Sequence, residues 1–354
     1  MAKLTVCILF GGRSAEHEVS ISSARSIYDN LNREKFEPVT LYVNKYGNWR
    51  RVASPHLSFE ELNAGPFHSF LPWTKGSPPG QISADIYFPV LHGPYGEDGT
   101  IQGFFEIGDV PYVGATVLSS AVGMDKTIAK AVFEQKDLPT VKHTVIRETD
   151  WLKDREICLD SFHSEFAPPV FVKPANLGSS VGITKVNDFN HLVPAVEEAF
   201  LFDRKILIEE GIQGRELECS VLGDEDPKAS LPGEIMPFND FYDYKDKYVD
   251  GRTSFGIPAE LSSDIIEEIQ RIAIEAFKSI EGSGMARVDF FLQDRPEKVY
   301  LNEINTIPGF TKISMYPKLW EVSGLSYPQL LEELIRLGLE RYRRKKGGEK
   351  HFSP

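Results

Sequence analysis

Cysteine is scarce in this chain of 354 residues. Its three cysteines, Cys7, Cys158 and Cys219, are scattered, lack metal-ligand spacing and are odd in number, which favours structural thiols in a reducing cytoplasm. Basic residues are also in deficit, and the formal net charge of −13 argues against a nucleic-acid surface. No apolar run approaches the length of a membrane span, and the N-terminus lacks a signal-peptide pattern. We therefore expect a cytoplasmic protein with no membrane or nucleic-acid partner.

The length and composition indicate a globular protein of more than one domain. A chain of 354 residues is too long for one ordinary core, so two or three domains are expected. A hydrophobic content of 41% with 26% charged residues is typical of a soluble globular protein. One basic cluster, residues 341–346, lies at the end of a predicted helix. Solvation and a favourable interaction with the helix dipole explain it more simply than a binding patch.

The N-terminal third has the pattern of an α/β layer. Residues 4–10 form a continuous apolar run, as in a parallel strand buried on both faces, and Gly11 and Gly12 end it. A helix is predicted to begin near Ser20 or Ser22. A second strand of this kind ends at residues 90–91 and meets a glycine-rich turn. Two strands that each lead into a glycine turn and a helix predict loops gathered at the strands' C-terminal ends.

From about Gly123 onward the pattern changes to mixed elements. Residues 54–83, rich in proline and glycine, are predicted to be loop or irregular structure. Helices are predicted at 125–136, 262–280 and 327–344. Strands are predicted near 140–146, 169–173, 205–209, 215–223 and 284–292.

Polar residues interrupt two apolar runs near the C-terminus. Because strand side chains alternate between faces, Arg287 and Asp289 share one face, as do Glu303 and Asn305. Turn formers at 292–298 predict that the two strands form an antiparallel pair. Two carboxylates, an amide oxygen and a guanidinium would then lie together, and hard oxygen ligands of this kind suit Mg²⁺. The alternative is the solvated face of an edge hairpin.

A lysine and a small-residue loop, Lys173 to Gly182, follow another predicted strand. Small residues let backbone N–H groups approach phosphate oxygens closely, and the lysine adds a cation. The same loop matches the hydrolase pattern Gly-x-Ser-x-Gly, with Ser180 as the nucleophile. That pattern requires a helix after the serine, whereas residues 183–186 read as a strand. A loop that covers phosphate is the better interpretation, and a plain hairpin turn is the alternative.

Three other segments carry weaker signals. Lys126 follows a glycine and an aspartate but lacks the spacing of a phosphate-binding P-loop, and a lone lysine there is more often solvated.

The bend at 207–218 could offer backbone groups and a carboxylate to a nucleotide, or be an acidic interdomain turn. The Tyr-rich loop, residues 239–251, is typical of a lid or of an Ω-loop packed by its own tyrosines.

Taken together, these segments resemble the D-alanine–D-alanine ligases, members of the ATP-grasp superfamily. The resemblance runs from about residue 4 to residue 335, and the motifs occur in family order. They are residues 10–20, 91–99, 124–126, 173–182, the Tyr-rich loop, 287–289 and 303–309. The resemblance implies α/β and α+β architecture: an ATP-grasp fold in three domains, with an N-terminal Rossmann-like (pre-ATP-grasp) domain. The implied ranges are 1–122, 123–210 with the glycine loop, 211–346 with the metal site, and a tail at 347–354.

The resemblance also implies a nucleotide and metal site. ATP would lie between the central and C-terminal domains, and two Mg²⁺ (or Mn²⁺) ions would bridge its phosphates to the protein. The implied nucleotide-binding residues are Lys126, Lys173, Ser180, Glu209, Ile212, Glu216 and Lys247. The implied metal ligands are Asp289, Glu303 and Asn305.

The implied reaction joins two D-alanine molecules through an acyl phosphate, for the synthesis of peptidoglycan precursors, and a homodimer is a family expectation. Arg287, the backbone N–H of Gly309 and Lys247 would stabilise negative charge. Glu16 would bind the ammonium of the first D-alanine, helped by His92 near its carboxylate. The residues implied to close the loop or hold the second substrate are Ser179, Tyr248, Ser314 and Met315.

The pair Lys247-Tyr248 favours an amine as the second nucleophile. In the family's D-alanine–D-lactate branch, this loop lacks the pair and places a histidine nearby. Here the one histidine between His163 and His351 is His191, well upstream of the loop. D-serine as second substrate is less easily excluded. The competing hypotheses are another ATP-grasp carboxylate–amine or carboxylate–thiol ligase, a nucleotide-binding module without catalysis, and a hydrolase that uses the glycine-loop serine.

Overall fold

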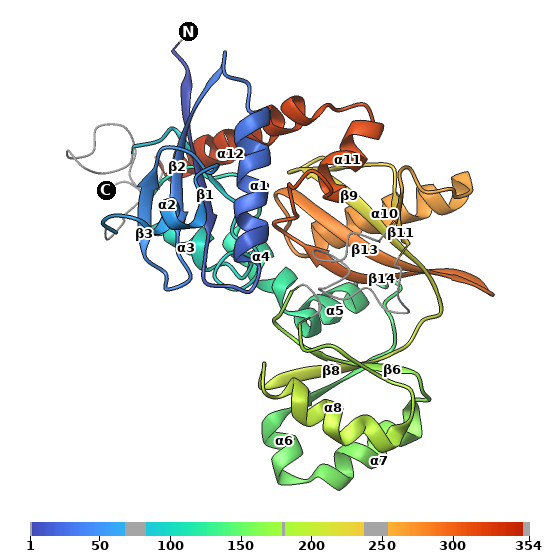
Figure 1. Ribbon diagram of the computed structural model, residues 1–354. Coiled ribbons are helices and arrows are strands. Elements are labelled where there is room, and N and C mark those ends of the chain that lie inside the picture. The colour runs from blue at the N-terminus through green and yellow to red at the C-terminus, as the bar shows by residue number, and fades with distance from the viewer. Residues whose placement is uncertain (1, 68–82, 179–180, 237–253, 350–354) are drawn as a thin grey trace.

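The computed structural model describes residues 2–67, 83–178, 181–236 and 254–349 (Figure 1). The strands are β1 (Leu4–Gly11), β2 (Phe36–Val43), β3 (Trp49–Val52), β4 (Ile86–Pro89), β5 (His143–Arg147), β6 (Val170–Pro174), β7 (Thr184–Val186), β8 (Lys205–Glu210), β9 (Gly214–Gly223), β10 (Lys228–Ala229), β11 (Gly233–Met236), β12 (Ser254–Gly256), β13 (Gly284–Asp294) and β14 (Glu297–Asn305). The α-helices are α1 (His17–Asn30), α2 (Phe59–Asn63), α3 (Thr100–Ile107), α4 (Val117–Met124), α5 (Lys126–Gln135), α6 (Glu148–Lys153), α7 (Arg155–Glu165), α8 (Leu192–Ala199), α10 (Ser263–Ser279), α11 (Met315–Val322) and α12 (Tyr327–Glu349).

The N-terminal sheet confirms the prediction of a parallel strand buried on both faces. Its order is β3-β2-β1-β4, and β1 runs parallel to both neighbours. Alternate residues of β1 enter different cores: Val6 and Ile8 pack with α1 and α12, whereas Cys7 and Leu9 pack with α3. Helices therefore cover both faces of the sheet, and the glycine turns lie at its C-terminal edge (Figure 1).

The predicted start of α1 at Ser20 or Ser22 is wrong, because the helix begins at His17. A serine before an apolar stretch usually indicates a helix cap. Here the Ser20 hydroxyl instead accepts a hydrogen bond from the Gly11 N–H at 2.8 Å and donates to the Val90 carbonyl. It ties α1 to the ends of two strands, which is a tertiary role that local sequence does not reveal.

Two further sheets form the rest of the described structure. The central sheet, β5-β8-β6-β7, is antiparallel, and α6, α7 and α8 contribute to its core. The C-terminal sheet has the order β12-β11-β9-β13-β14 and packs against α10. The irregular structure predicted for residues 54–83 is wrong for 59–63, where Ser58 and Glu61 form a reciprocal capping box for α2. Residues 68–82 lie outside the described ranges.

The basic cluster at 341–346 has specific partners, so its assignment to solvation and the helix dipole is wrong. Arg344, Lys345 and Lys346 form ion pairs with Glu225, Glu106 and Asp109, respectively. The Arg341 guanidinium donates to the carbonyls of Tyr112 (2.9 Å) and Gly114 and to Ser283 Oγ (2.7 Å). The end of α12 thus connects the N-terminal layer to the C-terminal sheet.

Replacement of Arg341 by Ala is expected to destabilise the protein. The change leaves two backbone carbonyls without their donor and removes a guanidinium that lies 4.4 Å from the Tyr112 ring. Hydrogen bonds to charged groups contribute about 1.5–3 kcal/mol each, so a fall of several degrees in the melting temperature is expected. Arg343→Ala on the exposed side of α12 is the matched control. Equal melting temperatures for the two variants would contradict the connecting role.

Candidate active site

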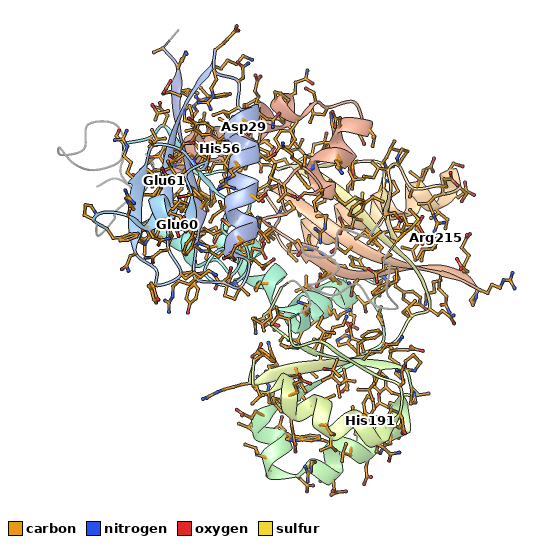
Figure 2. The ribbon with its side chains drawn as sticks, viewed as in Figure 1. Asp29, His56, Glu60, Glu61, His191 and Arg215 are labelled. Carbon is orange, nitrogen blue, oxygen red and sulfur yellow. The ribbon has the colours of Figure 1, made fainter. Side chains whose placement is uncertain are left out.

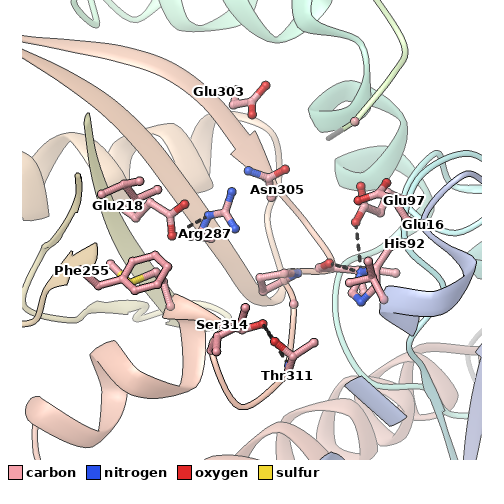
Figure 3. Close-up of a pocket in the computed structure, with 18 residues that line it drawn as sticks. Glu16, His92, Glu97, Glu218, Phe255, Arg287, Glu303, Asn305, Thr311 and Ser314 are labelled. Carbon is pink, nitrogen blue, oxygen red and sulfur yellow. Dashed lines mark hydrogen bonds and ion pairs between the residues drawn. The ribbon is translucent and has the colours of Figure 1, made fainter. Parts of the chain in front are cut away.

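The C-terminal hairpin brings the four predicted polar residues onto one face. Strands β13 and β14 pair antiparallel, with Arg287 opposite Asn305 and Asp289 opposite Glu303. A bulge follows Asp289, after which the register shifts. Arg287, Glu303 and Asn305 line the same pocket (Figure 3). The predicted antiparallel pair with a shared polar face is therefore confirmed.

Arg287 is held by two carboxylates within this pocket. Its Nε and Nη2 atoms donate to the two oxygens of Asp289, each at 2.7 Å, and Nε lies 3.2 Å from Glu218 Oε2. Burial alone would lower the pKa of Arg287, but these carboxylates raise it well above its usual value. The guanidinium therefore stays charged and has a fixed orientation, as a group that stabilises developing negative charge must have.

The donor set of this hairpin fits a hard divalent cation. Among the described residues, no group of three or more His, Cys, Asp and Glu side chains is arranged to hold a metal. The hairpin offers two carboxylates, those of Glu303 and Asp289, and the amide oxygen of Asn305. The Asn305 Nδ2 donates to Asp289 Oδ2 at 3.0 Å, which orients this amide. Mg²⁺ commonly takes one or two carboxylates and completes its shell with phosphate oxygens and water. The residues present suit that mode of binding.

Lys126 links the hairpin to the glycine loop. It is the first residue of α5, and Asp125 caps this helix by accepting from two backbone N–H groups. The Lys126 ammonium donates to the Leu177 carbonyl at 2.7 Å and lies 3.4 Å from Glu303 Oε2. The lysine thus lies where the central sheet approaches the carboxylate face, within reach of an anion bound between them.

Lys173 and Glu209 form a buried ion pair, and Lys130 joins it. The Lys173 ammonium donates to Glu209 Oε2, and the Lys130 ammonium lies 2.7 Å from Glu209 Oε1. Burial alone would raise the pKa of Glu209, but the charges of Lys130 and Lys173 outweigh it and lower this pKa to about 2. The carboxylate is therefore ionised at neutral pH.

Replacement of Glu209 by Gln is expected to change the acid sensitivity of folding. Because the folded pKa of about 2 lies below the usual 4.5, the ionised carboxylate stabilises the fold above pH 4.5, and this contribution is lost as the pH falls toward 2. Between pH 5 and pH 3, the free energy of unfolding of the wild type should fall by about 2 kcal/mol more than that of Glu209→Gln. Denaturant unfolding at both pH values measures this. Glu210→Gln, an exposed neighbour, should keep the wild-type slope.

Glu16 lies where the N-terminal layer approaches the glycine loop. A Cβ atom added to Gly93 would lie 2.8 Å from Glu16 Oε2, and one added to Gly178 would lie 3.0 Å from the same oxygen. The carboxylate therefore packs directly against both backbones. Gly93 also has a φ of +72°, which favours glycine. Glu16 is 9% exposed and lines the same pocket as the hairpin residues. The loop of one domain thus comes within contact distance of a carboxylate from another.

His92 is buried behind Glu16 and connects the domains. Its Nδ1 donates to the Ile307 carbonyl at 3.0 Å, and its Nε2 lies 3.1 Å from the hydroxyl of Ser23. Glu97 Oε1 lies 3.6 Å from Nδ1 (Figure 3). Burial alone would lower the pKa of His92, but Glu97 and Glu16 raise it. Burial raises the pKa of Glu97.

The loop after β14 carries the last group of predicted residues. Ser314 is the N-terminal flanking residue of α11 and Met315 its first residue. The Ser314 hydroxyl accepts from the Thr311 N–H at 2.9 Å, and a Cβ on Gly309 would lie 2.6 Å from it. Phe310 N–H donates to Ser23 Oγ, which ties this loop to α1. Gly309, Ser314 and Met315 all line the pocket with Arg287.

The remaining predicted residues lie on β9, in the turn before it, or outside the described ranges. Glu216 is on β9 opposite Phe291, and Ile212 lies in the turn between β8 and β9. Ser179, Ser180, Lys247 and Tyr248 lie outside the described residues, as does the whole Tyr-rich loop. The strand β7, antiparallel to β6, follows the glycine loop. The described residues 181–186 form a turn and a strand and contain no helix, which confirms the argument against a hydrolase elbow at Ser180.

Three residues near the predicted site received no role from the sequence. They are Lys130, Glu97 and Glu218, and all three are buried. Lys130 lies four residues after Lys126, on the same face of α5, and this helical spacing is the signal that could have revealed it. Glu218 shares one face of β9 with Glu216, but whether that face meets Arg287 depends on which strand pairs with β9 and in which register.

The fold and the pocket define a class of enzyme. Two antiparallel sheets approach each other, one with a glycine loop and buried lysines and the other with a carboxylate–amide hairpin, and an α/β layer closes the third side (Figures 1 and 3). This is the arrangement of ATP-grasp ligases, which use ATP with a divalent metal. Family models described as D-ala D-ala ligase N-terminus and C-terminus match residues 5–115 and 132–336. The chain belongs to the D-alanine–D-alanine ligase family.

Individual relatives agree with this assignment. The chain is 47% identical to a D-alanine–D-alanine ligase of Bacillus cytotoxicus, with 98% of each chain covered, and 47% identical to one of Heliobacterium modesticaldum, with 98% and 97% covered. The solved D-alanine–D-alanine ligase of Coxiella burnetii has a TM-score of 0.89 at 38% identity and covers 99% of this chain and 98% of its own. The VanG D-Ala:D-Ser ligase of Enterococcus faecalis has a TM-score of 0.83 at 34% identity, with 95% and 100% covered.

Proposed function

We propose that this protein joins two D-alanine molecules to form D-alanyl-D-alanine, with conversion of ATP to ADP and phosphate, as a step in peptidoglycan precursor synthesis. One observation carries the proposal: the Glu16 carboxylate and the Arg287 guanidinium line one pocket with the Glu303–Asn305 face. A carboxylate can bind the ammonium of an amino acid, and the guanidinium and the metal-binding face suit its carboxylate and the phosphates. The family assignment supplies the substrate.

The nucleotide would lie between the central and C-terminal sheets. Lys126 and Lys173 would contact phosphate oxygens, with Ser180 and Lys247 beside them, and Glu209, Ile212 and Glu216 would hold adenine and ribose. Asp289, Glu303 and Asn305 would hold two Mg²⁺ or Mn²⁺ ions. The short distance between Lys126 and Glu303 supports this placement, because an anion and a cation bound there would each find a partner of opposite charge. When bound, the metal would neutralise charge on the phosphates.

The first step is phosphoryl transfer to an amino-acid carboxylate. The carboxylate of the first D-alanine attacks the γ-phosphorus and displaces ADP, which leaves an acyl phosphate. Glu16 would bind the ammonium of this D-alanine, and His92 would act near its carboxylate. The raised pKa of His92 supports this role, because a protonated imidazole attracts a carboxylate.

The second step is attack by the amine of the second D-alanine on the acyl carbonyl. Phosphate leaves from the tetrahedral intermediate, and the amine loses a proton. Arg287 and the Gly309 N–H would stabilise the oxyanion, and Ser314 with the Met315 backbone would hold the second carboxylate. Ser179 and Tyr248 would close the loop over the reactants. The position of Gly309 and Ser314 beside Arg287 in one pocket supports these assignments.

D-alanine is the better-supported second substrate. The relatives named as D-alanine–D-alanine ligases reach 47% identity, against 34% for the VanG D-Ala:D-Ser ligase. Figure 2 places His191 at the outer end of the central domain, away from the pocket, so this histidine does not stand in for the one of the D-lactate branch. The pair Lys247-Tyr248 supports an amine nucleophile.

The domain boundaries, assembly and location belong to the same proposal. We place the boundaries near residues 122, 210 and 346, since residues 146–208 contribute one separate core. A homodimer is part of the proposal as an expectation for this family. Free thiols at all three cysteines agree with the reducing cytoplasm, where ATP is available. Within the ranges that the structure covers, every helix is too short or too polar to cross a membrane.

The test is ATP-dependent phosphate release by purified protein with Mg²⁺. Reactions would contain D-alanine alone, L-alanine alone, or D-alanine with D-lactate or D-serine, and mass spectrometry would identify the products. Release with D-alanine alone and a dipeptide product is the expected result. A mixed product formed in preference to the dipeptide would refute the assigned second substrate, and no turnover with any pair would refute the ligase activity.

A further inference from the structure

Lys130 is a buried lysine to which the reaction described above assigns no role. Its side chain is 2% exposed, whereas that of Lys173 is 10% exposed at the edge of the glycine loop. Within the described ranges, Glu209 is the only carboxylate within 4.0 Å of either ammonium. Apart from this carboxylate, whose Oε1 lies 2.7 Å away, no hydrogen-bond partner of the Lys130 ammonium is found among the described residues. The pairing with Glu209 therefore accounts for its position.

The cluster has one positive charge more than its single carboxylate can balance. A buried charge is costly unless it is paired, so a site with two ammonium groups and one carboxylate is suited to a further anion. The positions of the two lysines indicate which one can respond. Lys173 lies near the end of β6, close to the glycine loop, whereas Lys130 lies on α5 and is almost fully buried. Lys173 is therefore the partner that can leave Glu209.

We propose that Lys130 is a positioning residue that keeps Glu209 paired when Lys173 turns to the phosphates of the nucleotide. This inference rests on the proposed ATP site. With Lys130 present, Lys173 can exchange Glu209 for phosphate without leaving a buried carboxylate alone. Without Lys130, Lys173 is the sole partner of Glu209, and phosphate must compete with that carboxylate for it.

The inference predicts a selective effect on the phosphate-dependent part of nucleotide binding. Replacement of Lys130 by Met should weaken binding of a non-hydrolysable ATP analogue about 10- to 100-fold, because a buried ion pair must then be broken. Adenosine has no phosphate, so its affinity should change by less than about threefold. The ratio of the two dissociation constants, measured by isothermal titration calorimetry, separates this effect from general damage to the adenine pocket.

Two further variants sharpen the test. Lys205 lies on β8, the strand that carries Glu209, and its partly buried side chain pairs with Asp125. Lys205→Met breaks that ion pair and should leave the ratio unchanged. The double variant Lys130→Met/Glu209→Gln should restore the ratio toward the wild-type value, because the amide no longer competes for Lys173. If Lys130→Met does not fold, Lys130→Gln provides the test: it keeps a hydrogen-bonding group beside Glu209 but no charge, and it should show the same selective loss of affinity for the ATP analogue.

Each outcome decides between the hypotheses. An unchanged ratio in Lys130→Met, or an equal loss for both ligands, would overturn the role of Lys130 while leaving the proposed function in place. Equal changes for the two ligands in Lys130→Gln would also overturn it. Wild-type protein that bound neither ligand would instead refute the proposed ATP site, and the inference with it.

Discussion

Replacement of Arg287 by Lys is expected to lower kcat for dipeptide formation by about 10²- to 10³-fold. The guanidinium uses two nitrogens to bind Asp289 and also lies against Glu218, so its position in the pocket is fixed from two sides. Lysine keeps the positive charge but presents a single flexible ammonium that cannot reproduce this bidentate geometry. Arg287→Lys should therefore fold nearly as well as the wild type while its kcat falls.

A matched arginine on the same sheet serves as the control. Arg215 forms a bidentate pair with Glu234 at 2.8 Å and 2.6 Å, and it lies toward the outer end of the C-terminal domain (Figure 2). Arg215→Lys makes the same chemical change away from the pocket and should keep kcat within about twofold of the wild type. Phosphate release and melting temperature would be measured for both variants. Similar losses of kcat in the two would mean that the arginines stabilise the sheet and nothing more.

The parts of the site that follow from local alternation were predictable from the sequence. The hairpin of β13 and β14 was predicted because apolar and polar residues alternate on either side of a turn-rich segment. Alternation fixes which side chains share a face, and the tight turn fixes which strands pair. The proposed metal-binding face therefore needed no information from distant parts of the chain.

The parts that depend on distant contacts were not predictable in the same way. Ser20 reads as a helix cap, yet it bonds to the ends of two strands. The cluster at 341–346 reads as a solvated helix end, although Arg341 is held by Gly114 and Ser283, each more than fifty residues away. Lys130 received no role from the sequence, yet it is buried beside Glu209. In each case burial and pairing are set by the docking of domains, which one sequence without relatives does not specify.

The family resemblance added what residue patterns alone could not. The pocket brings Glu16, His92 and Arg287 together from segments separated by as many as 271 positions in the sequence, and only the known order of motifs predicted that they would meet. The roles of Lys247 and Tyr248 depend on the resemblance alone, because they lie outside the described residues. Their assignment stays a prediction.

Replacement of Glu303 by Gln is expected to abolish metal-dependent turnover, with a fall in kcat of about 10³-fold. Glu303 is opposite Asp289 on the hairpin and lies 3.4 Å from the Lys126 ammonium, so it is the carboxylate closest to both the proposed metal and the proposed phosphate site. The amide of glutamine is nearly the same size, so the fold should be retained. It is neutral, however, and a much weaker ligand for a hard cation.

Nucleotide binding provides a readout that is independent of turnover. In the wild type, Mg²⁺ should strengthen the binding of ADP and raise the melting temperature, because a ligand that binds only the folded state stabilises it. In Glu303→Gln this Mg²⁺-dependent increment should be small, while binding of ADP without metal should persist or improve, since a negative charge has been removed beside the phosphates. Glu297→Gln, at the exposed start of the same strand, is the control. A wild-type response to Mg²⁺ in Glu303→Gln would place the metal on other ligands, and a similar loss in Glu297→Gln would attribute the effect to the strand rather than to the carboxylate.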